Sequence, residues 1–201
     1  GKNPNPEVNK IVGAPGVEAS RNFANKIWNA SRFVMMNLSV DKNELPDLSK
    51  LHIEDKWILH RYNELVREIT ENLDKYELGI AVQKLYDFIW DEFCDWYIEL
   101  VKPRFSEIGD SNETAQKVLI YVLSNTLKLL HPFMPFITEE IWQALPHDGE
   151  SIMISEWPKY NEELVNVSAE QDMTVIMEAI KGVRNVKNEM NVPPSKKIKF
   201  F

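Results

Sequence analysis

The chain has 201 residues, of which 44% are hydrophobic and 27% charged, and this is enough for one or two domains with a buried core. Its formal net charge of −8 argues against binding nucleic acid without regard to sequence, and seven glycines are too few for an all-β fold with many tight turns. A single cysteine, Cys94, excludes an intramolecular disulfide and a cysteine-rich zinc site, and it favours a reducing, cytoplasmic compartment. No apolar run reaches the roughly 18 residues of a membrane span, so we expect no membrane partner.

The charges are distributed unevenly along the chain. Residues 51–110 hold seven Lys and Arg against fourteen Asp and Glu. Two basic islands flank this acidic middle: residues 15–37 carry three cations and one acid, and residues 181–199 carry six cations and one acid. An acidic protein with basic islands is expected to bind RNA only at chosen places.

Hydrophobic periodicity predicts a mainly helical chain up to about residue 147. Gly79 is expected to break one long helical pattern, Pro103 and Pro132 to end helices, and Ser111 or Asn112 to cap the helix between them. The expected helices cover residues 17–38, a stretch from Trp57 to Leu73, 78–103, a helix from 111 or 112 to about 131, and 136–145.

The pattern changes after residue 147. SIMISEWP (151–158) is short and β-rich and predicts a strand or an extended strap, after which residues 169–190 return to a helical pattern. SKKIKFF (195–201) alternates like a strand, and a lone strand has nothing to pair with, so we expect a piece of a longer protein. The predicted domains are an irregular N-terminal arm (1–16), a helical bundle (17–147), and a strap, helix and start of a small α/β unit (148–201).

Motifs for catalysis are missing from the sequence. It contains no phosphate-binding glycine loop, no GxSxG and no HExxH, and its four histidines lack metal-ligand spacing. We therefore expect no catalytic residue, metal or cofactor in this chain. Cys94 lies between aromatic residues and is interpreted as a small core residue. The predicted helix 78–103 also carries four acidic residues that could be considered for catalysis or metal binding, and we interpret them as a solvated or salt-bridged face. They are Asp91, Glu92, Asp95 and Glu99.

Asparagines are unusually frequent in the first predicted helix, although Asn competes for its own backbone and is a poor helix former. On a wheel of 100° per residue, one apolar stripe forms the predicted buried face. It consists of Phe23, Ile27, Ala30, Val34 and Leu38. A second face carries amides, cations and an aromatic ring, and it consists of Asn22, Asn25, Lys26, Asn29 and Phe33, with Arg21 and Arg32 beside them.

This second face has the chemistry of an RNA-binding surface. An amide both donates and accepts hydrogen bonds and can pair with a base edge, adenine especially. Phe33 or Trp28 can stack on a splayed base, while Arg and Lys bind phosphates. The alternative is that the asparagines bond to neighbouring helices and that Phe33 packs on one of them.

Five segments of the sequence together resemble the valyl-tRNA synthetase family. They are RNFANKIWNASRFVMMNL (21–38), DKWILHRYNELV (55–66), LYDFIWDEFCDWYIELVKPR (85–104), LLHPFMPFITEEIWQALP (129–146) and NEMNVPPSKKI (188–198). They match the C-terminal, anticodon-binding domain of that family in order. Residues 1–16 fit the family poorly, and its HIGH and KMSKS motifs are absent from this sequence.

The resemblance implies a mainly all-α fold, the anticodon-binding helical bundle of class Ia aminoacyl-tRNA synthetases, with a short extended or strand segment near 151–157 and a truncated α/β piece at the C-terminus. It implies binding of the tRNA(Val) anticodon stem-loop, with catalytic and editing domains of the same parent chain as further partners, and ATP and Mg in the parent's catalytic domain. Two alternatives stay open, which are the same domain of an isoleucyl- or leucyl-tRNA synthetase and a helical protein-interaction module without an RNA role.

With the resemblance, we predict that Asn22, Asn25, Lys26 and Asn29 face the anticodon loop. Arg21 and Arg32 are assigned to phosphates and Phe33 to stacking. Further phosphate contacts are predicted for cations elsewhere in the chain, and these are Lys102, Arg104, Lys181, Arg184 and Lys187.

Overall fold

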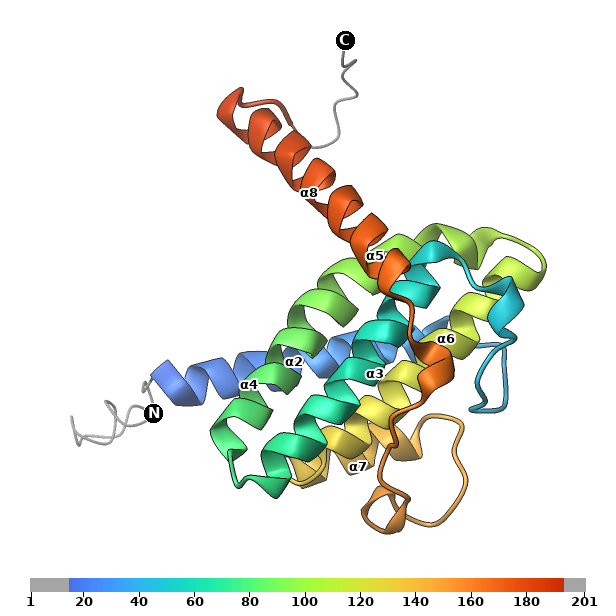
Figure 1. Cartoon of the computed structure of the whole chain (residues 1–201), viewed down its shortest axis with the longest axis vertical. Coiled ribbons are helices and arrows are strands. Elements are labelled where there is room, and N and C mark those ends of the chain that lie inside the picture. The colour runs from blue at the N-terminus through green and yellow to red at the C-terminus, as the bar shows by residue number, and fades with distance from the viewer. Residues whose placement is uncertain (1–14, 194–201) are drawn as a thin grey trace, which may run out of the picture.

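A computed structural model describes residues 15–193, and it is helical with no strand among those residues (Figure 1). The prediction of a mainly all-α bundle is confirmed. The α-helices are α2 (Pro15–Met36), α3 (Ile53–Asp74), α4 (Leu78–Asp87), α5 (Ile98–Val101), α6 (Asp110–Leu130), α7 (Pro135–Gln143) and α8 (Val167–Glu189). Between them lie the π-helix η2 (Phe88–Tyr97) and the 3₁₀ turns η1 (Leu48–Lys50), η3 (Lys102–Ser106), η4 (Ile152–Ile154) and η5 (Glu162–Leu164).

The core lies between α3, α6 and the continuous rod made by α4, η2 and α5. Helix α3 buries its apolar positions at helical spacing, with Ile58, Leu65 and Ile69 almost completely covered. Its first turn is closed by Asp55, whose Oδ2 accepts the His52 backbone N–H at 3.0 Å. Cys94 is buried in this core, as expected, and burial raises the pKa of its thiol to about 12.

The break between α3 and α4 is at Tyr76, and the prediction that the helix breaks at Gly79 was wrong. The Glu77 N–H donates to the Asn72 carbonyl at 2.8 Å and the Tyr76 N–H to the Leu73 carbonyl at 3.0 Å. These are the two bonds of a Schellman motif, and Tyr76 takes the left-handed conformation (φ 59°) that glycine usually supplies there. Gly79 lies inside the first turn of α4.

The start of α6 also differs from the prediction. The helix begins at Asp110 after Gly109, and neither Ser111 nor Asn112 caps it. Instead, the Asn112 side chain donates back to the carbonyls of Phe105 and Glu107 and fixes the loop before the helix. At the other end, α6 ends at Leu130, before Pro132, as predicted, and α7 begins at Pro135, one residue before the predicted start at 136.

The segment after α7 is a strap across α3, and the alternative of a strand at 151–157 was wrong. Residues 152–154 form the 3₁₀ turn η4, and the chain then runs along α3 without β pairing. The Asn63 amide donates to the Asn161 carbonyl at 2.9 Å and accepts the Asn161 N–H at 2.8 Å, and Trp157 Nε1 donates to Thr70 at 3.0 Å. The strand predicted for 195–201 lies outside the described residues, as does most of the predicted arm.

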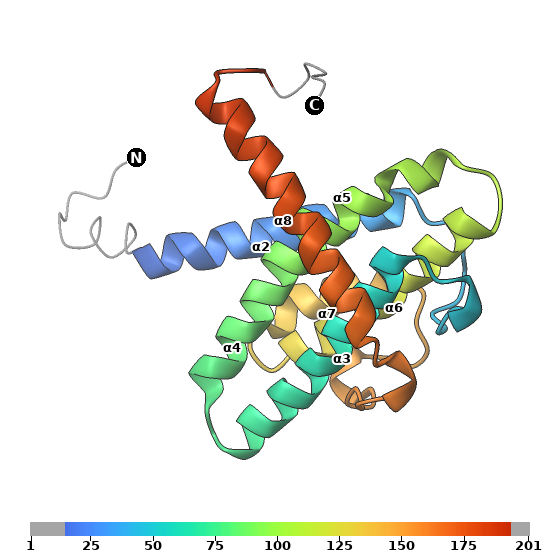
Figure 2. The same ribbon diagram turned by 45° about the horizontal axis from the view of Figure 1, so that its top comes forward.

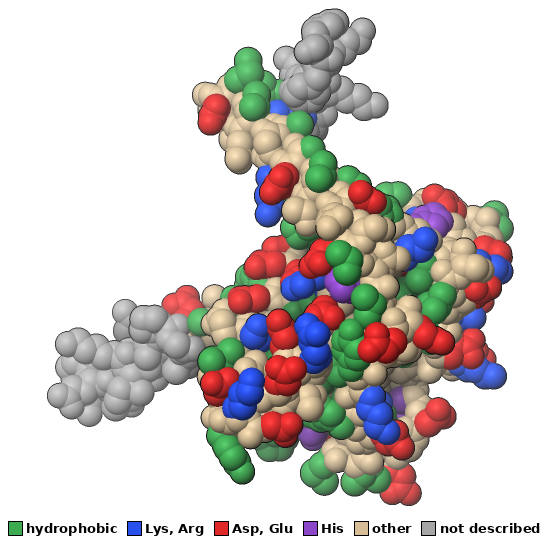
Figure 3. Space-filling model, in the orientation of Figure 1, with side chains coloured by type: hydrophobic (Ala, Val, Ile, Leu, Met, Phe, Trp, Pro, Cys, Tyr) green, Lys and Arg blue, Asp and Glu red, His purple; other side chains and the backbone are tan. Residues whose placement is uncertain are grey.

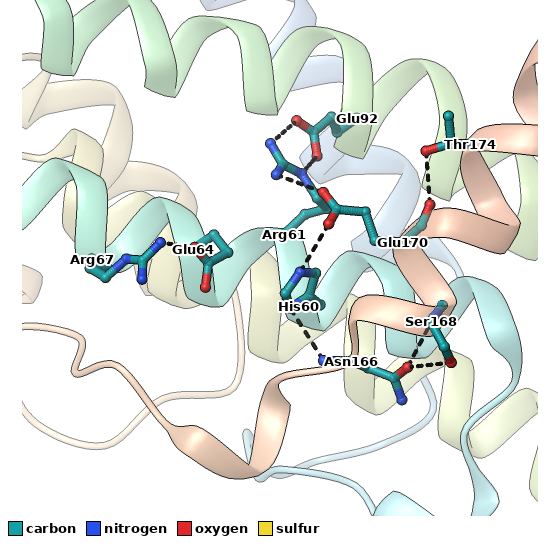
Figure 4. A network of polar contacts seen from close by, with 10 residues as sticks. His60, Arg61, Glu64, Arg67, Glu92, Asn166, Ser168, Glu170 and Thr174 are labelled. Atoms are coloured by element: carbon teal, nitrogen blue, oxygen red, sulfur yellow. Dashed lines mark hydrogen bonds and ion pairs between the residues drawn. The ribbon is translucent and has the colours of Figure 1, made fainter.

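Helix α8 leaves the bundle at an angle and projects from it, as both ribbon views show (Figures 1 and 2). Only its first turns are buried, at Ala169 and Met173. A polar network holds them (Figure 4): His60 Nε2 lies 3.3 Å from Glu170 Oε2, and Arg61 bonds both Glu170 and Glu92 at 2.9 to 3.1 Å. This network joins α3, η2 and α8. Across residues 15–193, no helix is long and apolar enough to cross a membrane.

Candidate nucleic-acid interface

Helix α2 lies against η2 and turns its predicted apolar stripe inward. Phe23, Ile27 and Val34 are buried, and the Phe23 ring lies 5.0 Å from the Tyr86 ring. Ser31, on the same side, donates to the Ile27 carbonyl at 2.7 Å and so brings no unpaired polar group into the core. Because this stripe faces the bundle, the opposite face of α2 is turned to solvent.

A groove runs between this outer face and the rod formed by η2 and α5. We call it the asparagine groove, and its volume is about 490 Å³. One wall consists of Asn22, Asn25, Lys26, Asn29, Ala30 and Phe33 of α2, and the other of Cys94, Asp95, Ile98, Glu99 and Lys102. The structure therefore brings together six of the predicted site residues, including Lys102, which is 69 positions beyond Phe33 in the chain.

The three asparagines of the groove have free amides. Asn22, Asn25 and Asn29 are exposed, and their side chains make no hydrogen bond to any residue between 15 and 193. The alternative in which they bond to neighbouring helices is not what the structure shows. Asn37, by contrast, donates to the Phe33 carbonyl at 2.8 Å and belongs to the end of the helix.

Lys26 lies in the groove, but its ammonium group is held. Its Nζ is 2.5 Å from Asp95 Oδ1 and 4.1 Å from the centroid of the Trp90 ring. The side chain is 23% exposed. A cation that pairs with a carboxylate and lies over an indole ring has little remaining attraction for a phosphate. Lys26 therefore joins α2 to η2.

Phe33 is half-buried at one end of the groove. Its ring lies 5.8 Å from the Phe105 ring, and Lys102 Nζ is 5.3 Å from its centroid. Lys102 in turn pairs with Glu99. The ring is thus fixed in place while part of it remains open to the groove, which suits a stacking partner for a base.

The outermost strip of α2 is cationic and aromatic. Arg21 and Arg32 are exposed, and Trp28 between them is 37% exposed. Neither arginine has an ion pair among the described residues. Both guanidinium groups are therefore exposed beside the groove, and the phosphate contacts predicted for them stay a prediction.

Arg104 is a correction to the predicted set, because it is buried inside the protein. Its side chain is 5% exposed and its Nη1 donates to Asp55 at 2.9 Å and to Glu54 at 2.8 Å. Nε and Nη2 donate to Ser111 at 3.1 and 2.8 Å. Although burial alone would lower its pKa, the Asp55 carboxylate raises the pKa of Arg104 above its ordinary value. Each of the three guanidinium nitrogens donates to the protein and the side chain is buried, so Arg104 is structural.

The cations of α8 are arranged around an aromatic ring. Lys181 Nζ lies 5.8 Å and the Arg184 guanidinium 5.5 Å from the centroid of Trp96, a residue of η2. Lys181 and Arg184 are exposed and Lys187, one turn further, is half-buried. The three predicted residues thus share one side of α8, on a different side of η2 from the asparagine groove.

A second hollow of about 600 Å³ is less suited to RNA. It lies between residues 39–44 and the start of α6, and its charged lining is mainly acidic. The charged residues are Asp41, Lys42, Glu44, Glu107, Asp110, Glu113 and Lys117. On the face shown in Figure 3, acidic and basic side chains are interspersed over α3 and α4. The asparagine groove is therefore the better candidate.

Comparison with known proteins agrees with this fold. A family model described as the anticodon-binding domain of tRNA ligase matches residues 55–201. The chain belongs to this family of anticodon-binding domains. It is 58% identical over 187 residues to a valine–tRNA ligase of Clostridium acetobutylicum and 51% identical over 186 residues to one of Bacillus cereus. Each alignment covers 92% of this chain and 21% of the relative.

A solved structure shows the same fold for this anticodon-binding domain. It is a crystal structure of a ternary complex, LeuRS–tRNA–LeuAMS, of Agrobacterium radiobacter K84. The similarity has a TM-score of 0.57 and 20% sequence identity, and it covers 75% of this chain and 17% of that one. The predicted resemblance to valyl-tRNA synthetases is confirmed by the sequence relatives, whereas the likeness to the leucine enzyme is one of fold.

Sequence reasoning missed two residues of the groove, Asp95 and Glu99. It interpreted them as part of a solvated or salt-bridged face, and both do form ion pairs, but their positions on the rod gave no sign that α2 would lie opposite. A signal was nevertheless present, since Asp95, Glu99 and Lys102 recur at helical spacing beside the aromatic residues that pack on α2. Among residues 15–193, no group of three or more His, Cys, Asp or Glu is arranged to hold a metal ion.

Proposed function

We propose that this chain is the part of a valine–tRNA ligase that holds the anticodon stem-loop of tRNA(Val). The observation that carries the proposal is the asparagine groove, in which three exposed amides without a partner among residues 15–193 line up beside the half-buried ring of Phe33. Unpaired amides on a rigid helix can pair with base edges at little entropic cost.

The proposed binding mode assigns a role to each wall of the groove. Bases of the loop turn toward Asn22, Asn25 and Asn29, and an amide that donates and accepts at once matches adenine. Phe33 stacks on one base, and Arg21 and Arg32 hold the flanking phosphates. Lys181 and Arg184 of α8 are assigned to the backbone of the stem.

The chain spans 21% of the length of the curated relatives it matches, and aminoacylation is assigned to the rest of such a protein. ATP, Mg, and the catalytic and editing domains belong there. The contribution of this domain is positional: a tRNA that is bound at the anticodon presents its acceptor end to a distant active site, which lowers the entropic part of the barrier. We also assign the protein to the cytoplasm, because of its similarity to valine–tRNA ligases.

The proposal is tested by titrating the 201-residue chain into fluorescent hairpins with a valine anticodon loop or a scrambled loop. Asn25→Ala and Asn29→Ala should each weaken binding to the valine hairpin by about 1–3 kcal/mol, the value of one good amide–base pair. Asn125→Ala is the matched control, because that amide bonds only its own helix, at the Tyr121 carbonyl. Equal losses in all three variants, or none, would refute the proposed site.

Salt dependence separates this function from a protein-interaction module. Binding through phosphates should weaken steeply with salt, with a slope of about 0.7 per contacted phosphate on a single strand. Arg21→Ala and Arg32→Ala should each reduce that slope by about one contact. Binding that does not respond to salt would point instead to apolar helix packing.

A further inference from the structure

Helix α8 has only a short apolar contact with the bundle, at its base. Ala169 and Met173 are buried, whereas every residue from Thr174 to Glu189 is exposed or half-buried (Figures 1 and 2). Arg184 lies 14 positions beyond the first turn at Glu170, which is about 21 Å along the helix. A tilt of about 15° at the base would therefore move Arg184 by about 5 Å. The direction of α8 thus depends on what holds its first turn.

The first turn of α8 is held by a polar network (Figure 4). Arg61 donates from Nε and Nη2 to the two oxygens of Glu92 at 2.9 and 3.0 Å, and from Nη1 to Glu170 Oε1 at 3.1 Å. The other Glu170 oxygen lies 3.3 Å from His60 Nε2, and His60 Nδ1 accepts the Asn166 N–H at 3.2 Å. Because Nδ1 is the acceptor, Nε2 carries the proton and donates to Glu170. A rotation of α8 about its base must stretch bonds to both α3 and η2.

The network is partly shielded from water. The His60 side chain is 5% exposed, and the side chains of Arg61 and Glu92 are 33% and 24% exposed. Salt therefore screens these pairs less than it screens pairs on the open surface. The bidentate contact with Glu92 also fixes the plane of the Arg61 guanidinium, so that Nη1 is aimed at α8.

Further along α8, the contact with η2 is looser. Lys181 Nζ and the Arg184 guanidinium lie 5.8 and 5.5 Å from the Trp96 centroid, close to the outer limit of about 6 Å for such a contact. Both side chains are exposed, and neither has an ion pair or hydrogen bond among residues 15–193. Their N–H groups remain for another partner, so the direction of the helix is set at its base.

We propose that Arg61 and His60 are positioning residues that fix the direction of α8 through Glu170, so that the cations of α8 and the asparagine groove bind one RNA as a single rigid surface. The inference rests on the proposed function, because RNA is the shared ligand. Glu92 belongs to η2, the element whose Asp95 lines the groove, so the network joins α8 to a wall of the groove. Two rigidly connected surfaces bind one ligand more tightly than two flexibly connected ones, since their ordering is complete before binding.

The first measurement is the direction of α8 in the chain without RNA. Spin labels at Asp74→Cys in α3 and Asn185→Cys in α8, both exposed positions, give a distance distribution by pulsed EPR. Cys94 is buried and its thiol has a pKa of about 12, so it does not take the label. We expect one narrow distribution in the otherwise unaltered chain and a broad one after Arg61→Met or Glu170→Gln.

Arg67→Met is the matched control for Arg61→Met. Arg67 lies on the same helix α3 and carries the same charge, but its partners Glu64 and Tyr160 lie outside α8. The distance distribution should stay narrow in this variant.

The second measurement is the share of α8 in RNA binding. Replacing Lys181 and Arg184 together by alanine should weaken binding of the valine hairpin by about 10-fold, as for two exposed charge contacts. In the Arg61→Met chain the same replacement should cost less than about 3-fold, and in the Arg67→Met chain it should keep its full effect. Sites without shared partners normally act additively, so this coupling separates positioning from a purely local role of Arg61.

The outcomes distinguish this inference from the function on which it rests. A broadened distribution together with the reduced loss in the Arg61→Met chain supports it. An unchanged distribution in both network variants overturns it, and so does a full loss in the Arg61→Met chain. In those two cases a preference of the unaltered chain for the valine loop over a scrambled loop leaves the proposed function standing. Binding of no hairpin above the scrambled control refutes both.

Discussion

Replacing Arg104 by methionine should destabilise the fold and leave RNA binding unchanged. Arg104 joins η3 to α3, and its guanidinium is the only cation that pairs with Asp55 within residues 15–193. Methionine fills much of the same volume but leaves the Asp55 carboxylate, which is completely buried, with two donors. These are the Tyr97 hydroxyl at 2.7 Å and the His52 backbone N–H at 3.0 Å.

The expected cost follows from this burial. Removing one partner of a buried ion pair costs about 3–5 kcal/mol, because the other charge stays desolvated. Five hydrogen bonds that Arg104 donates to Asp55, Glu54 and Ser111 are lost together with the charge. With a urea m-value of about 2 kcal/mol/M, the unfolding midpoint should fall by about 2 M. Arg104→Lys keeps the charge but loses the planar fork, and it should cost less than Arg104→Met.

The assay is urea unfolding followed by far-UV circular dichroism, together with RNA binding at several salt concentrations below the midpoint. Combining Arg104→Met with Asp55→Asn should recover more than about 1 kcal/mol relative to the sum of the single changes, since the two residues are in contact. If Arg104 instead contacted a phosphate of the RNA, Arg104→Met would leave the free energy of unfolding unchanged and would reduce the salt slope of RNA binding by about one contact. That result would refute the structural interpretation of Arg104.

Three further changes test local features of the fold by the free energy of unfolding in urea. Tyr76→Gly should stabilise the protein by about 0.5–1 kcal/mol, because Tyr76 is 88% exposed and its left-handed backbone suits glycine; a loss of stability would contradict this. Gly109→Ala should cost about 1–3 kcal/mol, since φ of 121° is strained for any side chain even though nothing crowds it, and an unchanged midpoint would count against that strain. Burial raises the pKa of Cys94 from its ordinary 9.0 to about 12, so the unfolded thiol loses its proton first and stability falls as pH rises above 9. Cys94→Ala should remove about 1.4 kcal/mol of the loss between pH 8 and pH 10, and an equally steep loss in both proteins would exclude this cause.

Much of the fold could be predicted because its signals are local. The apolar positions of α2 recur at helical spacing, and Phe23, Ile27 and Val34 are buried as the wheel requires. Pro132 and Pro135 impose the turn before α7 by restricting their own backbone and that of the preceding residue. The break at Tyr76 could not be predicted in this way. A tyrosine rarely adopts the left-handed conformation, and here it is stabilised by capping hydrogen bonds that form only in the folded chain.

The site was harder to predict because its decisive contacts join distant parts of the chain. Arg104 is an apparent surface cation until Asp55, 49 positions earlier, is placed beside it. In the same way, Lys26 is an apparent ligand of the anticodon loop until Asp95 is placed 2.5 Å from its ammonium group. The exposure of the asparagines was easier to predict, because the face opposite a clear apolar stripe is turned to solvent wherever the helix packs.

The central claim is that the α2 wall of the asparagine groove reads the anticodon. An amide NMR titration of the 201-residue chain with two hairpins tests it most directly, one with a valine anticodon loop and the other changed only at the middle anticodon base. We predict selective shifts at residues 21–33 with the valine hairpin, and these shifts should report even weak binding. Equal shifts with both hairpins, or shifts confined to residues 181–199, would contradict the claim and leave the asparagines without a role in recognition.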